Sequence, residues 1–367
     1  GIASRGLGDV YKRQEFNLAE TCVESLTIDQ LFQISGKNKK DLSEILNLKM
    51  TYGEIKGSDR LRKAIAALYE KQTFENVLVT HGTIGANMLV HKTLVGRGDR
   101  VVSFIPTYQQ HFSIPKSIGA DVHFLKLREE NNWLPDLDEL KQLVIPGTKL
   151  IALTNPNNPT GSLIDKEMLA LIAEIAAEAG SWILCDEVYR GTDQQGTGMT
   201  ASITDIYEKG ISTAGMSKAY SLAGLRLGWV TAPHKVIEDV MIHRDYDTIS
   251  VGMVDDYLAT VALESVDRLL ERAHEITRGN LNYLSSWLDG ETKLSWVKPR
   301  SGTTALVKIE LPIKSYDFCV TLLKETGVMF TPGAAMGMEG FIRVGYANNP
   351  DVLRAGLSRV SEYLKNI

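Results

Sequence analysis

The most informative stretch of the chain is Ser217–Gly228, which reads SKAYSLAGLRLG. It places Lys218 just after a predicted strand, with the hydroxyl of Ser217 before it and Arg226 eight residues after it. A lysine amine can form a Schiff base with the aldehyde of a cofactor, and an arginine can bind a phosphate through paired hydrogen bonds. The stretch therefore predicts a site for pyridoxal phosphate (PLP), with Lys218 as the covalent anchor.

A second motif lies thirty-two residues upstream, where Trp182–Tyr189 reads WILCDEVY. Apolar residues lead into Asp186 as they do at the carboxyl end of a buried strand, which is where open α/β sheets bind ligands. A carboxylate there can keep a pyridine nitrogen protonated, so that the ring accepts electrons from the α-carbon of a substrate. Tyr189 can donate a hydrogen bond to the phenolic oxygen of the cofactor. The alternative is that Asp186 caps a helix that follows the strand.

A third motif is the loop Asn155–Gly161, which reads NPNNPTG and in which prolines restrict the backbone before glycine ends the turn. With the loop, the acid, the tyrosine, the lysine and the arginine in this order, the chain from about Glu15 onward resembles the class I/II aminotransferases. These form a large family of fold-type I PLP enzymes. The resemblance implies that Asn158 donates to the phenolic oxygen of the cofactor beside Tyr189 and also borders the substrate.

The same resemblance implies the rest of a cofactor cradle. It places the PLP phosphate at a helix start, on backbone N–H groups of Gly82, Thr83 and Ile84, and it stacks Tyr108 on the pyridine ring. The alternatives are a simple strand-to-helix turn with Thr83 as the N-cap, and ordinary packing for Tyr108. One position departs from the family pattern. Gly215 stands three residues before the lysine, where many relatives carry Ser or Thr that contacts the phosphate, so a weaker hydroxyl contribution is expected.

Three further residues concern the substrate and a partner subunit. Arg343, in the segment FIRVG, matches the arginine that binds the substrate α-carboxylate in the family, although it could be a surface strand arginine. Tyr52 matches a tyrosine that reaches across a dimer interface to the phosphate of the partner, which implies a homodimer. Glu20 lies in a segment that is glycine-rich in many aminotransferases. It could pair with a cationic substrate side chain, or it could be a capping or solvated glutamate.

Two segments, Arg244–Ser250 and Pro299–Ala305, look like segments of capreomycidine synthase, a family member that acts on a hydroxylated arginine. From the resemblance to the class I/II aminotransferases as a whole, we expect an aminotransferase that acts on an amino acid and a 2-oxo acid. The alternative is a PLP-dependent lyase, cyclase or oxidase that acts on an arginine-like amino acid. A non-catalytic effector-binding domain is a minor alternative, because no DNA-binding region is expected before residue 15.

Composition limits the remaining possibilities. A net charge of −5 argues against nucleic acid as a partner, and no run of about 18 apolar residues predicts a membrane span. Cys22, Cys185 and Cys319 are odd in number and far apart, which indicates a reducing cytoplasm without a disulfide framework. The seven histidines lack paired ligand spacing, so no metal site is expected.

The pattern along the chain predicts an α/β protein, and the family resemblance implies the PLP-dependent transferase fold. Apolar strands alternate with amphipathic helices from residue 59 to 235, which predicts a mainly parallel seven-stranded sheet in a large domain over 51–248. A smaller α+β domain is expected over 249–367, with the segment 15–50 packing on it, and 1–14 is expected to be an artefactual leader. The expected strands are Val77–Thr80, Val101–Ile105, Val122–Leu127, Leu150–Thr154, Ile183–Cys185, Ile211–Ala214 and Leu227–Thr231.

Overall fold

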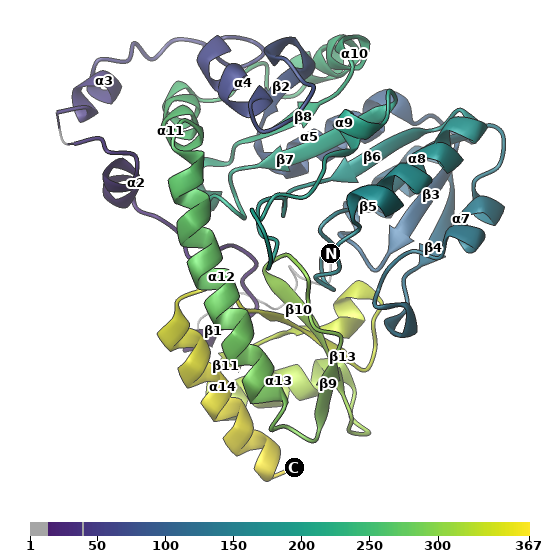
Figure 1. The fold of residues 1–367 in the computed structure, drawn as a ribbon, viewed down its shortest axis with the longest axis vertical. Helices are drawn as coiled ribbons and strands as arrows, with labels where there is room; N and C mark the ends of the chain where they lie inside the picture. Colours follow the sequence, from purple (N-terminus) through teal and green to yellow (C-terminus); the bar gives the residue numbers. More distant parts are fainter. Residues whose placement is uncertain (1–13, 39) are drawn as a thin grey trace.

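The computed structural model describes residues 14–38 and 40–367, so the predicted leader lies outside the described residues except for Gln14. Within these ranges the strands form a seven-stranded, a four-stranded and a two-stranded sheet. The seven-stranded sheet lies in the upper part of Figure 1 and the four-stranded sheet in the lower part.

The large sheet has the strand order β2-β8-β7-β6-β5-β3-β4. Strand β8 runs antiparallel to both of its neighbours, and the other neighbouring pairs are parallel. Each predicted strand is present within about two residues at either end, so the predicted α/β class and mainly parallel sheet are confirmed. The strands are β2 (Val77–Thr80), β3 (Arg100–Ile105), β4 (Asp121–Lys126), β5 (Thr148–Thr154), β6 (Trp182–Asp186), β7 (Gly210–Gly215) and β8 (Gly228–Thr231).

Helices cover both faces of this sheet because successive strand residues point to opposite sides. Val101, Leu150 and Leu184 pack in one core with α5 (Gly82–Leu94) and α10 (His234–Asp245). Their sequence neighbours in the same strands pack in another core with α7 (Leu137–Leu143) and α8 (Lys166–Ala179). The layers can be followed in Figure 1. The other helices of the upper part are α3 (Leu42–Leu46), α4 (Asp59–Ala66), α6 (Gln110–Ile118), α9 (Ile203–Ile206) and α11 (Met253–Leu263).

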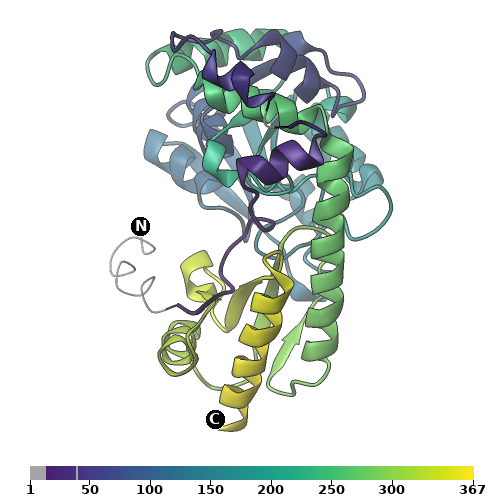
Figure 2. The ribbon, with the colours of Figure 1, turned by 90° about the vertical axis from the view of Figure 1, so that its left-hand side faces the viewer.

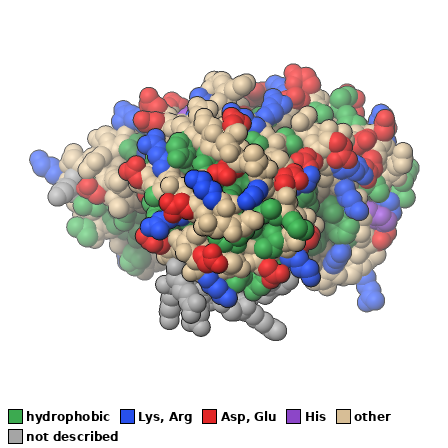
Figure 3. Space-filling view, turned by 90° about the horizontal axis from the view of Figure 1, so that it is seen from below, with side chains coloured by type: hydrophobic (Ala, Val, Ile, Leu, Met, Phe, Trp, Pro, Cys, Tyr) green, Lys and Arg blue, Asp and Glu red, His purple; other side chains and the backbone are tan. Residues whose placement is uncertain are grey.

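The lower part of the molecule is an α+β unit. Its antiparallel sheet has the order β12-β13-β10-β9, and α13 (Ser315–Thr326) and α14 (Pro350–Lys365) pack on it through a separate apolar core. At the end of the molecule seen in Figure 3, basic and acidic side chains are interspersed rather than segregated by sign. The strands are β9 (Leu294–Trp296), β10 (Thr304–Ile309), β12 (Thr331–Pro332) and β13 (Phe341–Gly345).

Two segments connect the upper and lower parts, and Figure 2 shows both in side view. Helix α12 (Val266–Leu288) contributes Leu269 to the upper core and Leu284 to the lower core. The N-terminal segment begins in the lower part, where β1 (Phe16–Asn17) pairs with β11 (Val328–Met329).

The same segment then crosses to the upper part. There α2 (Ile28–Ile34) buries Leu31 and Phe32 in the core that contains Trp229. Segment 15–50 is thus divided between the two cores, and the domain limits stay a prediction. Among the described residues, every helix is too short or too polar to span a bilayer.

Candidate active site

Strand register brings the predicted cofactor residues to one edge of the large sheet. Asp186 at the end of β6 lies opposite Thr154 of β5 and Thr213 of β7. Gly228 at the start of β8 lies opposite Gly215 on one side and Thr80 on the other. Since the parallel strands end together, the segments that follow β2, β5, β6 and β7 all leave from this edge.

The helix start that follows β2 fits a phosphate. Helix α5 begins at Gly82, and the residue before it makes no side-chain cap, so the first N–H groups lack a side-chain acceptor. Gly82 has φ = +67°, and a Cβ built on it would lie 3.0 Å from Nη2 of Arg226. A Cβ on Gly228 would lie 2.4 Å from the backbone N of Thr83. An arginine and a glycine thus lie directly against an N-terminal turn, which is the chemistry of an anion site.

The hydroxyl of Thr83 explains why Gly215 stands where many relatives carry Ser or Thr. Thr83 lies inside the first turn of α5 rather than at its N-cap, and its buried Oγ1 has no hydrogen-bond partner among the described residues. A Cβ on Gly215 would lie only 2.5 Å from this oxygen. A Ser or Thr at 215 would therefore clash, and Thr83 places a hydroxyl in the same volume. An orphaned buried hydroxyl beside an arginine fits a phosphate that supplies the missing acceptor.

Asp186 is buried in a network of donors. Its Oδ2 accepts from Nδ2 of Asn87 at 2.8 Å and lies 3.2 Å from Nε2 of His111, while its Oδ1 accepts from the N–H of Val188 at 3.1 Å. Thr213 donates to Oδ1 of Asn87 at 2.6 Å and so orients this amide. A turn rather than a helix follows Asp186, so the helix-capping alternative does not describe it.

Sequence reasoning missed Asn87 and His111, which come from α5 and α6. The available signal was weak: each is a polar residue within a helix that follows a strand. His91 lies behind them, with its ring centroid 5.7 Å from that of His111. Burial, and then the neighbouring His111, lower the pKa of His91 to about 3, so His91 is neutral at physiological pH.

Lys218 projects from the segment after β7 toward the N-terminal segment. Its Nζ lies 6.0 Å from the ring centroid of the buried Tyr189 and donates to Oγ1 of Thr21 at 2.5 Å. Burial lowers the pKa of Lys218, but the acidic groups of Tyr189, Cys22 and Glu20 outweigh burial and raise the pKa above its usual value. Ser217 is half-buried beside it.

Arg343 and Asn158 come together from the two parts of the molecule. Arg343, in β13, donates from Nη1 to Oδ1 of Asn158 at 3.2 Å. Its Nη2 donates to the carbonyl of Ala19 and to Oγ1 of Thr331, each at 3.2 Å. Arg343 is half-buried at this junction, so it is not a surface strand arginine.

The remaining predicted residues are more exposed. Tyr108 is 40% exposed, and burial of the rest of its ring, followed by the charge of Asp186, raises its pKa. Ile84 and Arg226 are also exposed, and Tyr52 is 78% exposed.

Glu20 is exposed, and its Oε1 accepts from the N–H groups of Thr21 at 2.7 Å and Cys22 at 3.2 Å. Partial burial opposes ionisation of Glu20, but these bonds and the charge of Lys218 lower its pKa overall. Glu20 thus makes the capping contacts of the alternative interpretation, in a position where the charge of Lys218 reaches it.

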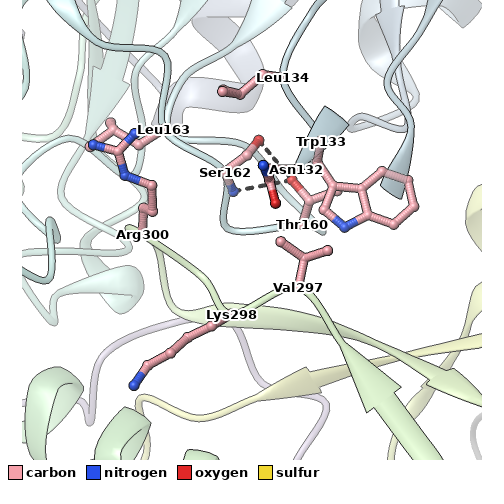
Figure 4. A pocket seen from close by; sticks show the side chains of 9 residues that line it. All are labelled: Asn132, Trp133, Leu134, Thr160, Ser162, Leu163, Val297, Lys298 and Arg300. Carbon is pink, nitrogen blue, oxygen red and sulfur yellow. Dashed lines mark hydrogen bonds between the residues drawn. The ribbon is translucent and has the colours of Figure 1, made fainter. Parts of the chain in front are cut away.

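A small pocket of about 150 Å³ borders the NPNNPTG loop at Thr160. Figure 4 shows Thr160 and Ser162 hydrogen-bonded to each other in its wall, with Val297 below them. The lining residues are Asn132, Trp133, Leu134, Thr160, Ser162, Leu163, Val297, Lys298 and Arg300. The predicted cofactor residues lie outside this set, so this pocket is separate from the site at the edge of the sheet.

The fold and the site together define a fold-type I PLP enzyme: a helix start that fits a phosphate, a buried carboxylate and a lysine lie at one edge of a mainly parallel sheet. Residues 37–360 match the model of the family "Aminotransferase class I and II", and the chain belongs to this family. It is therefore a PLP-dependent aminotransferase by class, which confirms the resemblance, the enzyme class and the cofactor inferred from the sequence.

The relatives that match this chain include aminotransferases on the one hand and a synthase and a cyclase on the other. Capreomycidine synthase of Streptomyces vinaceus is 30% identical over 322 residues, which cover 88% of this chain and 82% of that protein. The structure of a PLP-dependent aminotransferase from Streptococcus suis matches with a TM-score of 0.95 and 40% identity over 98% of this chain and 96% of that one. The PLP-dependent cyclase OrfR matches with a TM-score of 0.90 and 27% identity over 98% and 96%.

Proposed function

We propose that this aminotransferase moves an amino group between an amino acid and a 2-oxo acid at a site built around Lys218. PLP would be held by backbone N–H groups of Gly82, Thr83 and Ile84 together with Arg226 and Ser217. When bound, PLP supplies the electron sink that stabilises negative charge at the α-carbon of the amino acid. Tyr108 would cover one face of its ring.

The protein supplies the proton transfers. Lys218 would take the proton from the α-carbon and return it elsewhere on the reacting molecule, as general base and then general acid. Asp186 would keep a proton on the ring nitrogen, and the bonds from Asn87 and His111 hold its carboxylate in one orientation. Tyr189 and Asn158 would donate to the phenolic oxygen.

Substrate orientation would fall to Arg343. Its guanidinium presents parallel donors that match a carboxylate, and its partners include a side-chain amide, a carbonyl and a hydroxyl. An α-carboxylate is a stronger acceptor than these neutral groups, so it can replace them. Asn158, which contacts Arg343, would then border both the cofactor and the substrate.

The observation that carries the proposal is the position of Lys218. Its amine lies between the buried Tyr189 and the N-terminal segment, just beyond the sheet edge that carries Asp186 and the phosphate cradle.

The test is a screen of amino donors with 2-oxoglutarate as acceptor. The amount of 2-oxo acid product and the visible absorbance of the bound cofactor should be followed together. We expect one 2-oxo acid formed for each amino acid consumed, with a change of cofactor absorbance on adding donor alone. Consumption of the donor without its 2-oxo acid would overturn transamination and favour the second candidate.

The second candidate is a lyase, cyclase or oxidase that acts on an arginine-like amino acid. It is supported by the similarity to capreomycidine synthase and to the cyclase OrfR. It is also supported by Glu20, an acidic residue near enough to Lys218 for the lysine charge to lower its pKa. This candidate keeps the cofactor residues and differs in what happens after the α-proton is removed.

Glu20→Gln tests whether the site recognises a cationic side chain. If Glu20 pairs with it, the parent should prefer arginine-like or lysine-like donors, and the variant should lose this preference by roughly tenfold. Reaction with alanine is the internal control and should stay constant, because the cofactor residues are untouched. An unchanged donor ranking in the variant, or a parent that prefers aromatic or acidic donors, would remove Glu20 from substrate recognition.

We also propose that the active form is a cytoplasmic homodimer. Tyr52 is supported as an interface residue by its exposure and by Leu46 and Met50 nearby, which are 83% and 76% exposed. A cytoplasmic location is supported by the three cysteines, all of which are buried free thiols. Light scattering of the purified protein tests the dimer, and Tyr52→Ala should weaken PLP retention if Tyr52 reaches the phosphate of a partner subunit.

A further inference from the structure

Two side chains of the N-terminal segment meet the amine of Lys218. Nζ donates to Oγ1 of Thr21 at 2.5 Å and lies 3.5 Å from Sγ of Cys22. Thr21 is half-buried and Cys22 is buried.

Contacts from both parts of the molecule hold the backbone around Thr21 in place. The N–H of Val23 donates to the carbonyl of Lys218 at 3.3 Å, which ties the segment to the large sheet. Thr303, which precedes β10 in the lower part, donates from Oγ1 to the carbonyl of Thr21 at 2.7 Å. Glu20 fixes the backbone from the other side by accepting the N–H of Thr21. The backbone of Thr21 is therefore fixed beside the lysine, and its hydroxyl reaches the amine from that fixed position.

A freed lysine amine needs a defined position. During transamination it is joined to the cofactor for part of the cycle and free for the rest, when it moves the proton of the substrate. A long lysine side chain has several rotatable bonds, so a free amine without a partner samples many positions. A fixed acceptor limits these positions and shortens the search for the α-carbon.

We propose that Thr21 is a positioning residue: its hydroxyl holds the amine of Lys218 whenever that amine is not joined to the cofactor. This rests on the proposed function, in which Lys218 moves the α-proton. Thr21 is favoured over Cys22 as the principal partner because a hydroxyl accepts from an ammonium better than a thiol does and lies 1 Å closer, at 2.5 Å against 3.5 Å.

The ionisable side chains around the amine are those of Tyr189, Cys22 and Glu20. Burial raises the pKa of the Cys22 thiol, although Lys218 opposes this, so Cys22 remains a neutral thiol. The Thr21 hydroxyl does not ionise in this pH range, so removing it changes no formal charge at the site.

The test compares Thr21→Val, which keeps the shape of the side chain and removes the hydroxyl, with Thr21→Ser, which keeps the hydroxyl. We expect kcat to fall roughly tenfold in Thr21→Val with KM unchanged, because a hydrogen bond to a charged group is lost. Thr21→Ser should return kcat to within about twofold of the parent. Thr93→Val is the matched control, since the Thr93 hydroxyl donates to the carbonyl of Leu89 within α5 and lies outside the site.

A second readout needs no turnover. The rate at which the cofactor-free protein takes up PLP rises with pH as the Lys218 amine loses its proton. The midpoint of this profile should move to lower pH in Thr21→Val, because the hydroxyl accepts from the charged form and stabilises it. It should stay in place in Thr21→Ser and Thr93→Val. If Thr21→Val does not fold, Cys22→Ala and Thr303→Val remain as tests, with a smaller shift expected from each.

The outcomes separate this inference from the proposed function. An unmoved midpoint and unchanged kcat in Thr21→Val, in a protein that still requires Lys218, would overturn the role of Thr21 and leave the function intact. Equal losses in Thr21→Val and Thr21→Ser would also overturn it, since they would reflect packing rather than the hydroxyl. Full activity in a Lys218→Ala variant would instead refute the proposed function.

Discussion

In the proposed site, the residues that would hold the cofactor and those that would hold the substrate are positioned by different kinds of structure; we call them the cofactor side and the substrate side. The cofactor side stands at the ends of paired strands, where Asp186 and Gly228 are positioned by sheet register. The substrate side is formed by the irregular segment Ala19–Glu24 and by Arg343 of the small sheet. It is held by single hydrogen bonds and by close backbone approach: a Cβ on Gly345 would lie 1.8 Å from the carbonyl oxygen of Glu20.

This difference separates the residues that the reaction needs from those that decide which substrate reacts. Register fixes many backbone groups at once, so a cofactor cradle built on it tolerates few changes. An irregular segment pinned at a few points can change its side chains without moving the sheet. Substitutions on the cofactor side should therefore abolish the reaction, and substitutions on the substrate side should change which molecule reacts and how fast.

The largest expected effect is that of Lys218→Ala. No covalent anchor and no proton-transfer group would remain, so kcat should fall by at least on the order of 10⁴-fold. PLP could still bind through the phosphate cradle, with an absorbance spectrum that no longer depends on pH as in the parent. Turnover at the parental rate would show that the reaction does not depend on Lys218, and the contrast between the two sides would fail.

Asp186→Asn is the next largest and tests the buried side of the ring. The carboxylate accepts from Asn87 and Val188, and an amide of similar shape leaves the pocket nearly intact. Proton exchange at the α-carbon should slow by on the order of 10²-fold, the scale for losing one preorganised charge, with little change in substrate binding. Exchange measured by NMR in deuterated water would count against Asp186 if it stayed at the parental rate.

Arg343→Ala should have an intermediate effect and tests the substrate side. Loss of a charge-assisted pair corresponds to about 1.5–3 kcal/mol, which should appear mainly as a raised KM for amino acids. Arg343→Lys is the control that keeps the charge and loses the paired geometry. Its KM for amino acids should lie between those of the parent and Arg343→Ala. Amines that lack a carboxylate should react equally in all three proteins; discrimination against them that persists in Arg343→Ala would assign the carboxylate to another residue.

The smallest expected effect concerns stability at the junction between the two parts. Asp193 is buried and accepts from Ser301 at 2.7 Å, and burial raises its pKa to about 6 from 3.8. The folded protein then binds this proton more tightly than the unfolded chain. The contribution of Asp193 is most favourable below pH 4, and it falls as pH rises from 4 to 6.

Asp193→Asn keeps an acceptor for Ser301 and cannot ionise. It should flatten the pH dependence of stability between pH 4 and pH 6 and raise stability at pH 7 by about 1–2 kcal/mol, less than the full shift implies because the site relaxes. Urea denaturation of both proteins at pH 4.5 and pH 7, chosen as about the ends of this window, measures it. A variant with the same pH dependence as the parent would show that Asp193 is not charged differently in the two states.

Sequence reasoning was accurate where periodicity carries information. All seven strands of the large sheet were located from apolar runs bounded by glycine and polar residues. The positions of the motifs at the ends of these strands could therefore also be predicted. The partners of Asp186 were missed because Asn87 and His111 lie within helices whose spacing indicates only packing. Thr21 was missed because its contact with Lys218 joins residues 197 positions apart, and no local pattern records such a contact.

Helix α12 has a consequence for folding. Its 23 residues extend about 35 Å, and one continuous rod carries Leu269 of the upper core and Leu284 of the lower core. Melting either core would leave half of this helix without its packing partner, which penalises partly unfolded states. The two parts should therefore melt in one cooperative transition, and adding PLP, which the large sheet would bind, should also raise the melting temperature of the lower part.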